Sequence, residues 1–198
     1  MASVTAVSGI EKSGAQNLRV RLRQDTRICH DRVDDVFGKL DFTTREGVCT
    51  FLQWNLRAYS CLDEWCRQSC LLLPERSTMI EEDLNVLGFE SETNSLTPPD
   101  QPADPEGVAY VVLGSTMGAR VLRKIWQTST DETVLRAGRF LCDNSLDIPC
   151  RDLMASLKSQ PHLGEKADRM VETAIQTFDV FLRSSQQAEQ TEKVSNLV

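Results

Sequence analysis

The chain has 198 residues, of which 40% are hydrophobic and 26% charged, as expected for one soluble globular domain. Its net charge of -7 argues against the broad basic surface that nucleic-acid binding requires, so we expect no nucleic-acid partner. The first residues lack the apolar core of a signal peptide, and no later apolar run approaches the length of a membrane span. We therefore expect a cytoplasmic protein with no membrane partner, and we expect its seven cysteines to be free thiols.

Helical periodicity dominates the chain and alternating strand patterns are nearly missing, so we expect an all-α fold of about seven helices. We expect a flexible N-terminus over residues 1–14, one domain over residues 15–186 and a polar tail over residues 187–198. The longer expected helices run from about Gln16 to Val36, from Thr44 to before Pro74, from Asp104 to about Trp126, from Asp131 to Leu141, from Pro149 to before Pro161, and from Glu165 to Ser184.

The first of these helices carries a histidine, His30, with Arg23 seven residues before it and Asp34 four residues after it. Residues at these spacings lie on nearly one face of a helix. Neutral imidazole is a good iron ligand, and a carboxylate on its other ring nitrogen fixes the tautomer. Arg23 lies roughly 10 Å along the helix from His30, which suits pairing with a propionate at the edge of a haem. The triplet predicts haem binding with His30 as the metal ligand; the alternative is a hydrogen-bonded histidine in an ordinary core helix.

The next two segments are structural in our interpretation. Thr43 and Thr44, followed by a glutamate, have the pattern of a helix start, and the apolar stripe after them includes Leu56 and Tyr59. The proline-rich stretch before Asp104 is predicted to be a loop within the domain, because the halves on either side look too small to fold alone. Asp104 and the proline after it then have the pattern of a helix N-cap and first helical residue.

The helix after Asp104 reads VAYVVLGSTMGARVLRKIW and carries Gly114 and Gly118 on one face. An internal glycine costs about 1 kcal/mol of helix stability relative to alanine, so two on one face need a reason. One interpretation is tight packing against another helix. The other is close approach of a haem plane, with Ser115 holding water near the iron-bound ligand and Met117 forming apolar wall. Both interpretations stay open at this point.

Taken together, LRQDTRICH with Asp34, the proline-rich loop, YVVLGSTMGARVL and ADRMVETAIQTFDVF resemble haem oxygenases, especially the compact bacterial branch found with bacteriophytochromes. The resemblance extends from about Leu18 to Leu182. It implies a single-domain haem oxygenase-like helical fold, with haem between a proximal helix bearing His30 and a distal helix bearing the two glycines. It also implies that haem is both substrate and cofactor. Molecular oxygen and an external electron donor would open the ring at a meso carbon, giving biliverdin, carbon monoxide and ferrous iron.

The resemblance further implies roles for individual residues. His30 would be the axial ligand, and a water network on the distal helix would deliver the proton. The implied catalytic positions are Gly114, Ser115 and Gly118, and the implied haem-binding residues are Arg23, Thr26, His30, Val33, Asp34, Tyr110, Met117 and Phe178. The implied partners are a reductant, such as ferredoxin or a flavin reductase, and a phytochrome that accepts biliverdin.

The chain departs from this family at two positions. Leu113 stands where many bacterial relatives carry a glutamate, and Cys150 lies near the position of a common tryptophan. Arg120 and Arg151 are alternative anchors for a propionate, although both fit solvated surface positions. Two other functions therefore stay open. The first is a non-catalytic haem-binding or haem-sensing protein on the same fold, and the second is a helical interaction protein without haem.

Overall fold

The computed structural model describes residues 17–68, 76–91 and 96–195, with side chains described up to residue 186. This part of the chain is all-helical, as the sequence predicts, and it contains no strand. None of its helices is long and apolar enough to cross a membrane. The described helices are α1 (Leu18–Asp25), α2 (Arg27–Phe37), α3 (Arg45–Gln68), α4 (Ser77–Leu87), α5 (Pro105–Trp126), α6 (Glu132–Arg136), α7 (Arg139–Cys142), α8 (Asp147–Ser159) and α9 (Glu165–Ser195).

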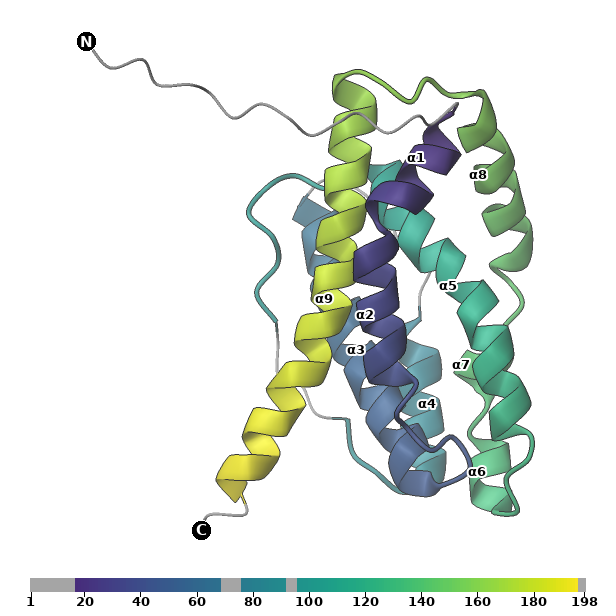
Figure 1. Ribbon diagram of the computed structural model, residues 1–198. Helices are drawn as coiled ribbons and strands as arrows, with labels where there is room; N and C mark the ends of the chain where they lie inside the picture. Colours follow the sequence, from purple (N-terminus) through teal and green to yellow (C-terminus); the bar gives the residue numbers. More distant parts are fainter. Residues whose placement is uncertain (1–16, 69–75, 92–95, 196–198) are drawn as a thin grey trace.

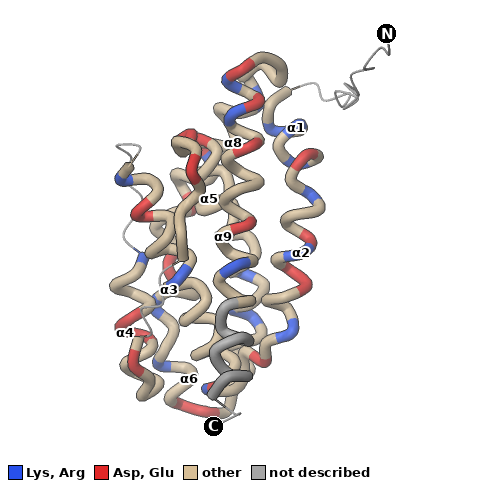
Figure 2. Tube along the Cα trace, turned by 90° about the vertical axis from the view of Figure 1, so that its left-hand side faces the viewer, with Lys and Arg blue, Asp and Glu red and all other residues tan. Residues whose placement is uncertain are grey.

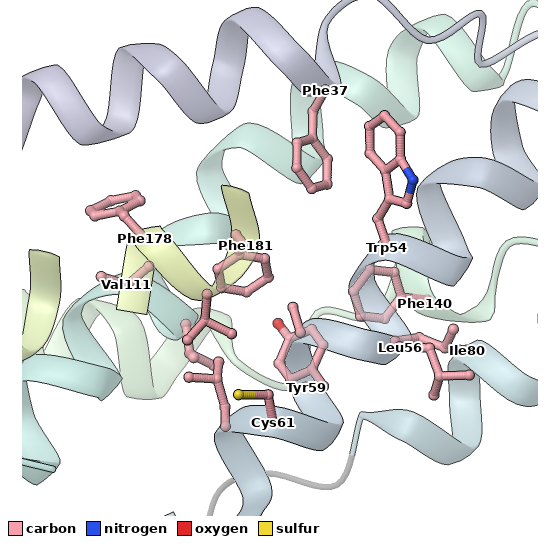
Figure 3. Close-up of a cluster of buried hydrophobic side chains, with 14 of the residues drawn as sticks. Phe37, Trp54, Leu56, Tyr59, Cys61, Ile80, Val111, Phe140, Phe178 and Phe181 are labelled. Carbon is pink, nitrogen blue, oxygen red and sulfur yellow. The ribbon is translucent and has the colours of Figure 1, made fainter. Parts of the chain in front are cut away.

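The long helix α9 is the packing centre of the fold. Helices α1, α2, α3 and α5 all pack against it, and α3 packs on its other side against α4 (Figure 1). The apolar stripe of α3 is buried as predicted, with Tyr59 and Trp65 among its largest buried side chains. In the core, the Tyr59 ring meets the rings of Phe140 and Phe181 at centroid distances of 5.9 and 5.8 Å (Figure 3). Burial of these amphipathic faces is the main source of helix stability here.

The start of α5 is built as the sequence predicts. The Asp104 carboxylate accepts hydrogen bonds from the backbone N–H groups of Glu106, at 3.0 Å, and Gly107, at 3.1 Å. Gly107 also brings the first turn of α5 into close contact with α9. A Cβ atom on Gly107 would lie 2.7 Å from the Met170 carbonyl oxygen and 2.8 Å from the Thr173 Cβ. This position is therefore where α5 is seated on α9.

The single helix expected from Gln16 to Val36 is wrong, because the chain breaks it at Thr26 into α1 and α2. The buried Thr26 hydroxyl donates a hydrogen bond of 2.7 Å to the Leu22 carbonyl oxygen. Such a bond to the preceding turn commonly bends a helix. The apolar periodicity continues across the break, so the sequence pattern did not reveal it.

The helix expected over residues 131–141 is likewise two short helices, α6 and α7. Between them the backbone passes directly against the Trp126 side chain. A Cβ on Gly138 would lie 2.5 Å from Trp126 Cζ2, so the chain leaves helical geometry where it meets this ring. The buried Asp83 carboxylate then accepts the first two N–H groups of α7, at 3.0 and 2.9 Å, and starts the helix again.

The remaining boundaries differ by smaller amounts. Helix α8 begins at Asp147 rather than Pro149, and α9 continues to Ser195 instead of ending near Ser184. Two predictions, the flexible N-terminus and the end of the helix before Pro74, fall outside the described residues. The six cysteines that the structure describes are free thiols.

The ion pair between Arg45 and Asp131 predicts a pH-dependent stability. The Arg45 Nε atom lies 2.6 Å from Asp131 Oδ2, and this hydrogen bond is the main reason that the pKa of Asp131 falls from 3.8 to about 2. A carboxyl group whose pKa is lower in the folded state than in the unfolded state stabilises the protein at pH values above the unfolded pKa. This stabilisation is lost as the pH falls through the folded-state pKa. We therefore expect Asp131→Asn, which can still cap α6, to be less stable than the wild type in urea unfolding near neutral pH. The difference should shrink between about pH 4 and pH 2. A difference that is independent of pH would contradict this account.

Candidate functional site

A side-chain hydrogen bond between Tyr110 and Thr26 joins α5 to the break between α1 and α2. Burial raises the pKa of Tyr110, and its bond to Thr26 partly offsets that effect. From this contact α2 and α5 run in the same direction and separate, and both pack against α9 (Figure 1). His30 follows Thr26 by four residues and Gly114 follows Tyr110 by four residues. Each therefore lies about one helical turn beyond the contact.

The imidazole of His30 projects from α2 with 56% of its side chain exposed. Its Nδ1 atom lies 3.2 Å from Asp34 Oδ2, the partner that the sequence predicts, and 3.9 Å from Asp31 Oδ1. The ring of Phe178, on α9, meets the imidazole edge to face at a centroid distance of 5.9 Å and an interplanar angle of 70°. These polar contacts involve Nδ1, so Nε2 is the nitrogen available to a metal.

The two glycines of α5 are not explained by tight helix packing. A Cβ on Gly118 would meet no heavy atom within 4 Å, and a Cβ on Gly114 would make only an ordinary contact of 3.8 Å with Met154 Cε. Beside them, Met117 is 64% exposed and Val121 60% exposed. The middle of α5 thus presents bare backbone and an uncovered apolar stripe. Met154, on α8, was not singled out by the sequence analysis.

Two arginines of α1 lie close enough to Tyr110 for their charges to lower the pKa of its hydroxyl, against the larger effect of burial. One is Arg23, which the sequence predicts, and the other is Arg19, one turn earlier. The spacing of four residues between them was the signal available in the sequence. Positive charge and a phenol hydroxyl therefore gather at the α1 end of the site, although α1 and α2 as a whole carry both signs of charge (Figure 2).

Ser115, itself exposed, is joined to a polar network that the sequence did not reveal. Its hydroxyl donates a bond of 2.7 Å to the Val112 carbonyl oxygen and shares a hydrogen bond with the buried Tyr59 hydroxyl. Tyr59 also bonds to Arg76 at the start of α4. The Arg76 guanidinium pairs with Asp143 and lies 4.5 Å from the centroid of the Phe140 ring. Sequence reasoning placed Tyr59 in the apolar core, where burial raises its pKa, and could not foresee its partners.

The other predicted residues lie around this arrangement. Val33, on α2, is half-buried and packs against the core, and Phe178 is buried. The alternative anchors are engaged elsewhere: Arg120 pairs with Asp147 at 2.7 Å, and Arg151 is a largely exposed residue 4.0 Å from Asp152. The charges of Arg19 and Arg23, by contrast, act on the Tyr110 hydroxyl.

The chemistry of these residues would suit a flat, apolar ligand that carries a metal at its centre and negative charge at one edge. The imidazole of His30 offers a nitrogen donor, and Asp34 can hold its tautomer. The open space beside Gly118 would let a flat ring lie close to the α5 backbone, whereas a side chain at this position would fill that space. The arginines at the α1 end offer charge-assisted hydrogen bonds to carboxylates.

No protein-family model matches this chain, and no curated protein matches its sequence. A similar solved structure is the heme oxygenase from Neisseria meningitidis in its NO- and CO-bound forms. The two chains are 21% identical, with a TM-score of 0.68, and the match covers 87% of this chain and 92% of the other. The chain therefore has the haem oxygenase fold that its sequence motifs predict.

The different surroundings of Gly107 and Gly118 predict opposite effects of alanine. Gly118→Ala meets open space, so we expect it to raise the unfolding free energy of the ligand-free protein by about 0.5–1 kcal/mol through helix propensity. Gly107→Ala forces a methyl group against the α9 backbone and should lower it by about 1–3 kcal/mol. Urea unfolding of both variants tests this. Destabilisation by Gly118→Ala would show that the surface of α5 is covered there.

Proposed function

We propose that this protein binds haem between α2 and α5 and acts as a haem oxygenase, opening the ring at a meso carbon to biliverdin, carbon monoxide and ferrous iron. One observation carries the proposal. The Tyr110–Thr26 hydrogen bond links α5 to the start of α2 in a haem oxygenase fold, and His30 and Gly114 each follow this contact by four residues, about one helical turn. Haem is then both substrate and cofactor, and supplies the iron at which molecular oxygen reacts.

On the α2 side, His30 is proposed to bind the iron through Nε2. The Asp34 Oδ2 atom lies 3.2 Å from Nδ1, and a hydrogen bond accepted there would select the tautomer with Nε2 unprotonated and make that nitrogen a better donor. Thr26 and Val33 lie about one turn before and after His30. They are proposed to border the ligand or to fix the position of the helix that carries His30. Thr26 acts through Tyr110, because its hydroxyl is buried.

On the α5 side, Gly114 and Gly118 are proposed to let the backbone approach the haem plane, with Met117 as apolar wall. Ser115 is proposed to hold water beside the iron. Its hydroxyl is fixed by Val112 and Tyr59, so a water bound to it would occupy a defined position. A water network at this position would deliver protons without a carboxylate between Gly107 and Trp126.

At the α1 end, Arg23, Arg19 and Tyr110 are proposed to hold the propionates. The reaction consumes electrons, so a reductant such as ferredoxin or a flavin reductase is a required partner. A phytochrome is the proposed acceptor of biliverdin, and the cytoplasm is the proposed location. A second candidate function is non-catalytic haem binding or sensing, which is favoured by the lack of any aspartate or glutamate from Gly107 to Trp126.

The first test is addition of hemin to wild type and His30→Ala, followed by ascorbate or reduced ferredoxin in air. We expect a Soret band in the wild type that depends on His30 and gives way to the broad absorption of biliverdin. A stable Soret band without conversion would support haem binding or sensing instead. A spectrum that is the same with and without His30 would overturn the ligand assignment, and no Soret band at all would favour a protein that does not bind haem.

The second test concerns the arginines. Because a partly exposed ion pair contributes about 1 kcal/mol, we expect Arg23→Ala to weaken hemin binding about fivefold. It should leave binding of haem dimethyl ester, which has no free carboxylates, unchanged. Arg27→Ala is the matched control, since Arg27 is 79% exposed and lies 3.6 Å from Asp31. An equal loss for hemin and the ester in Arg23→Ala would exclude a contact with the propionates.

A further inference from the structure

The orientation of the His30 ring depends on contacts from two different helices. Asp34 belongs to the same helix as His30 and is itself 67% exposed, so it can move with the histidine. Phe178 comes from α9 and is only 8% exposed. A buried aromatic ring is held in place by its neighbours, whereas an exposed carboxylate on a surface helix keeps rotamer freedom.

The two contacts constrain different motions of the imidazole. The pairing of Nδ1 with Asp34 Oδ2, at 3.2 Å, favours the ring orientation in which Nε2 points away from the helix. The edge-to-face contact with Phe178, at 5.9 Å and 70°, limits how far the ring can swing about its bond to the backbone. This centroid distance lies within the range of about 4.5–7 Å that is typical of attractive aromatic contacts.

We propose that Phe178 is a positioning residue that holds the His30 imidazole in the orientation needed to bind iron, by fixing its plane from α9. This role differs from contact with the haem itself, and it rests on the proposed function, because the orientation of His30 matters only if its Nε2 binds a metal. In this role Phe178 acts before the ligand arrives, so its effect is present in the haem-free protein.

Phe181 provides a matched control. It lies one turn further along α9, is 7% exposed, and its ring meets Tyr59 rather than His30 (Figure 3). Phe178→Leu and Phe181→Leu therefore remove similar amounts of buried aromatic surface from one helix. Only the first removes the ring that faces the imidazole.

The first measurement uses the haem-free protein, so it does not depend on iron. Three-bond NMR couplings of His30 report whether its side chain occupies one rotamer or averages over several. We expect one dominant rotamer in the wild type and in Phe181→Leu, and averaged couplings in Phe178→Leu. Couplings that Phe178→Leu leaves unchanged would overturn the positioning role.

The second measurement uses the haem complex. We expect Phe178→Leu to broaden and shift the iron–histidine stretching band of the ferrous protein in resonance Raman spectra, and to weaken hemin binding about threefold to tenfold, while Phe181→Leu keeps the wild-type band. An unchanged band in Phe178→Leu would also count against the role. Failure of the proposed function is a separate result: a hemin spectrum in the wild type that does not depend on His30 would remove the metal ligand, whatever the NMR couplings show.

Discussion

Both helices that form the candidate site are seated on α9 rather than on each other. Helix α5 meets it through backbone at Gly107, where a Cβ would lie 2.7 Å from a carbonyl oxygen, and α2 meets it through His30 and Phe178. The hydrogen bond between Tyr110 and Thr26 closes one end of the arrangement. The spacing between the two helices is therefore set by a third helix and one polar contact. Tyr110 and His30, which are proposed to touch the ligand, are therefore also among the residues that set this spacing.

Burying the polar side chains that join Ser115 to Arg76 costs desolvation free energy, which other interactions in the fold must offset. A buried guanidinium loses its hydration, and it is tolerated only when its charge and donors are matched. The charge of Arg76 is met by Asp143, by the Tyr59 hydroxyl and by the face of the Phe140 ring, while its buried Nε has no hydrogen-bond partner among the described residues. Phe140 lies in α7, and Asp143 is the residue directly after this helix. Helix α7 is separate from α6 because the backbone at Gly138 lies against the Trp126 ring, and Asp83 then caps the start of α7. The break in that segment thus supports the network that fixes Ser115.

The sequence was most informative where structure follows from near neighbours. The spacing of His30 and Asp34 places their polar atoms 3.2 Å apart, and Asp104 caps α5 as its pattern predicts. It failed where a partner comes from a distant segment. Tyr59 fits an apolar stripe, and nothing near it in the chain points to Arg76 or Ser115. The break at Thr26 coincides with the hydrogen bond from its hydroxyl to the Leu22 carbonyl oxygen, which apolar periodicity does not reveal. The glycines were ambiguous until the surroundings of each could be compared, since packing explains Gly107 but not Gly118.

Helix α5 is held by specific contacts at both of its ends. Its first turn is fixed by Asp104 and Gly107, and its last turn by Trp126, whose indole N–H donates to the Val134 carbonyl oxygen at 2.9 Å. Between these two ends lie Gly114 and Gly118, where the helix backbone bends most easily. A ligand that presses against the middle of α5 would bend the helix there and leave the contacts at its two ends in place. The middle of α5 would thus move to fit the thickness of a ligand bound against it, while the packing of α5 on α9 stays unchanged.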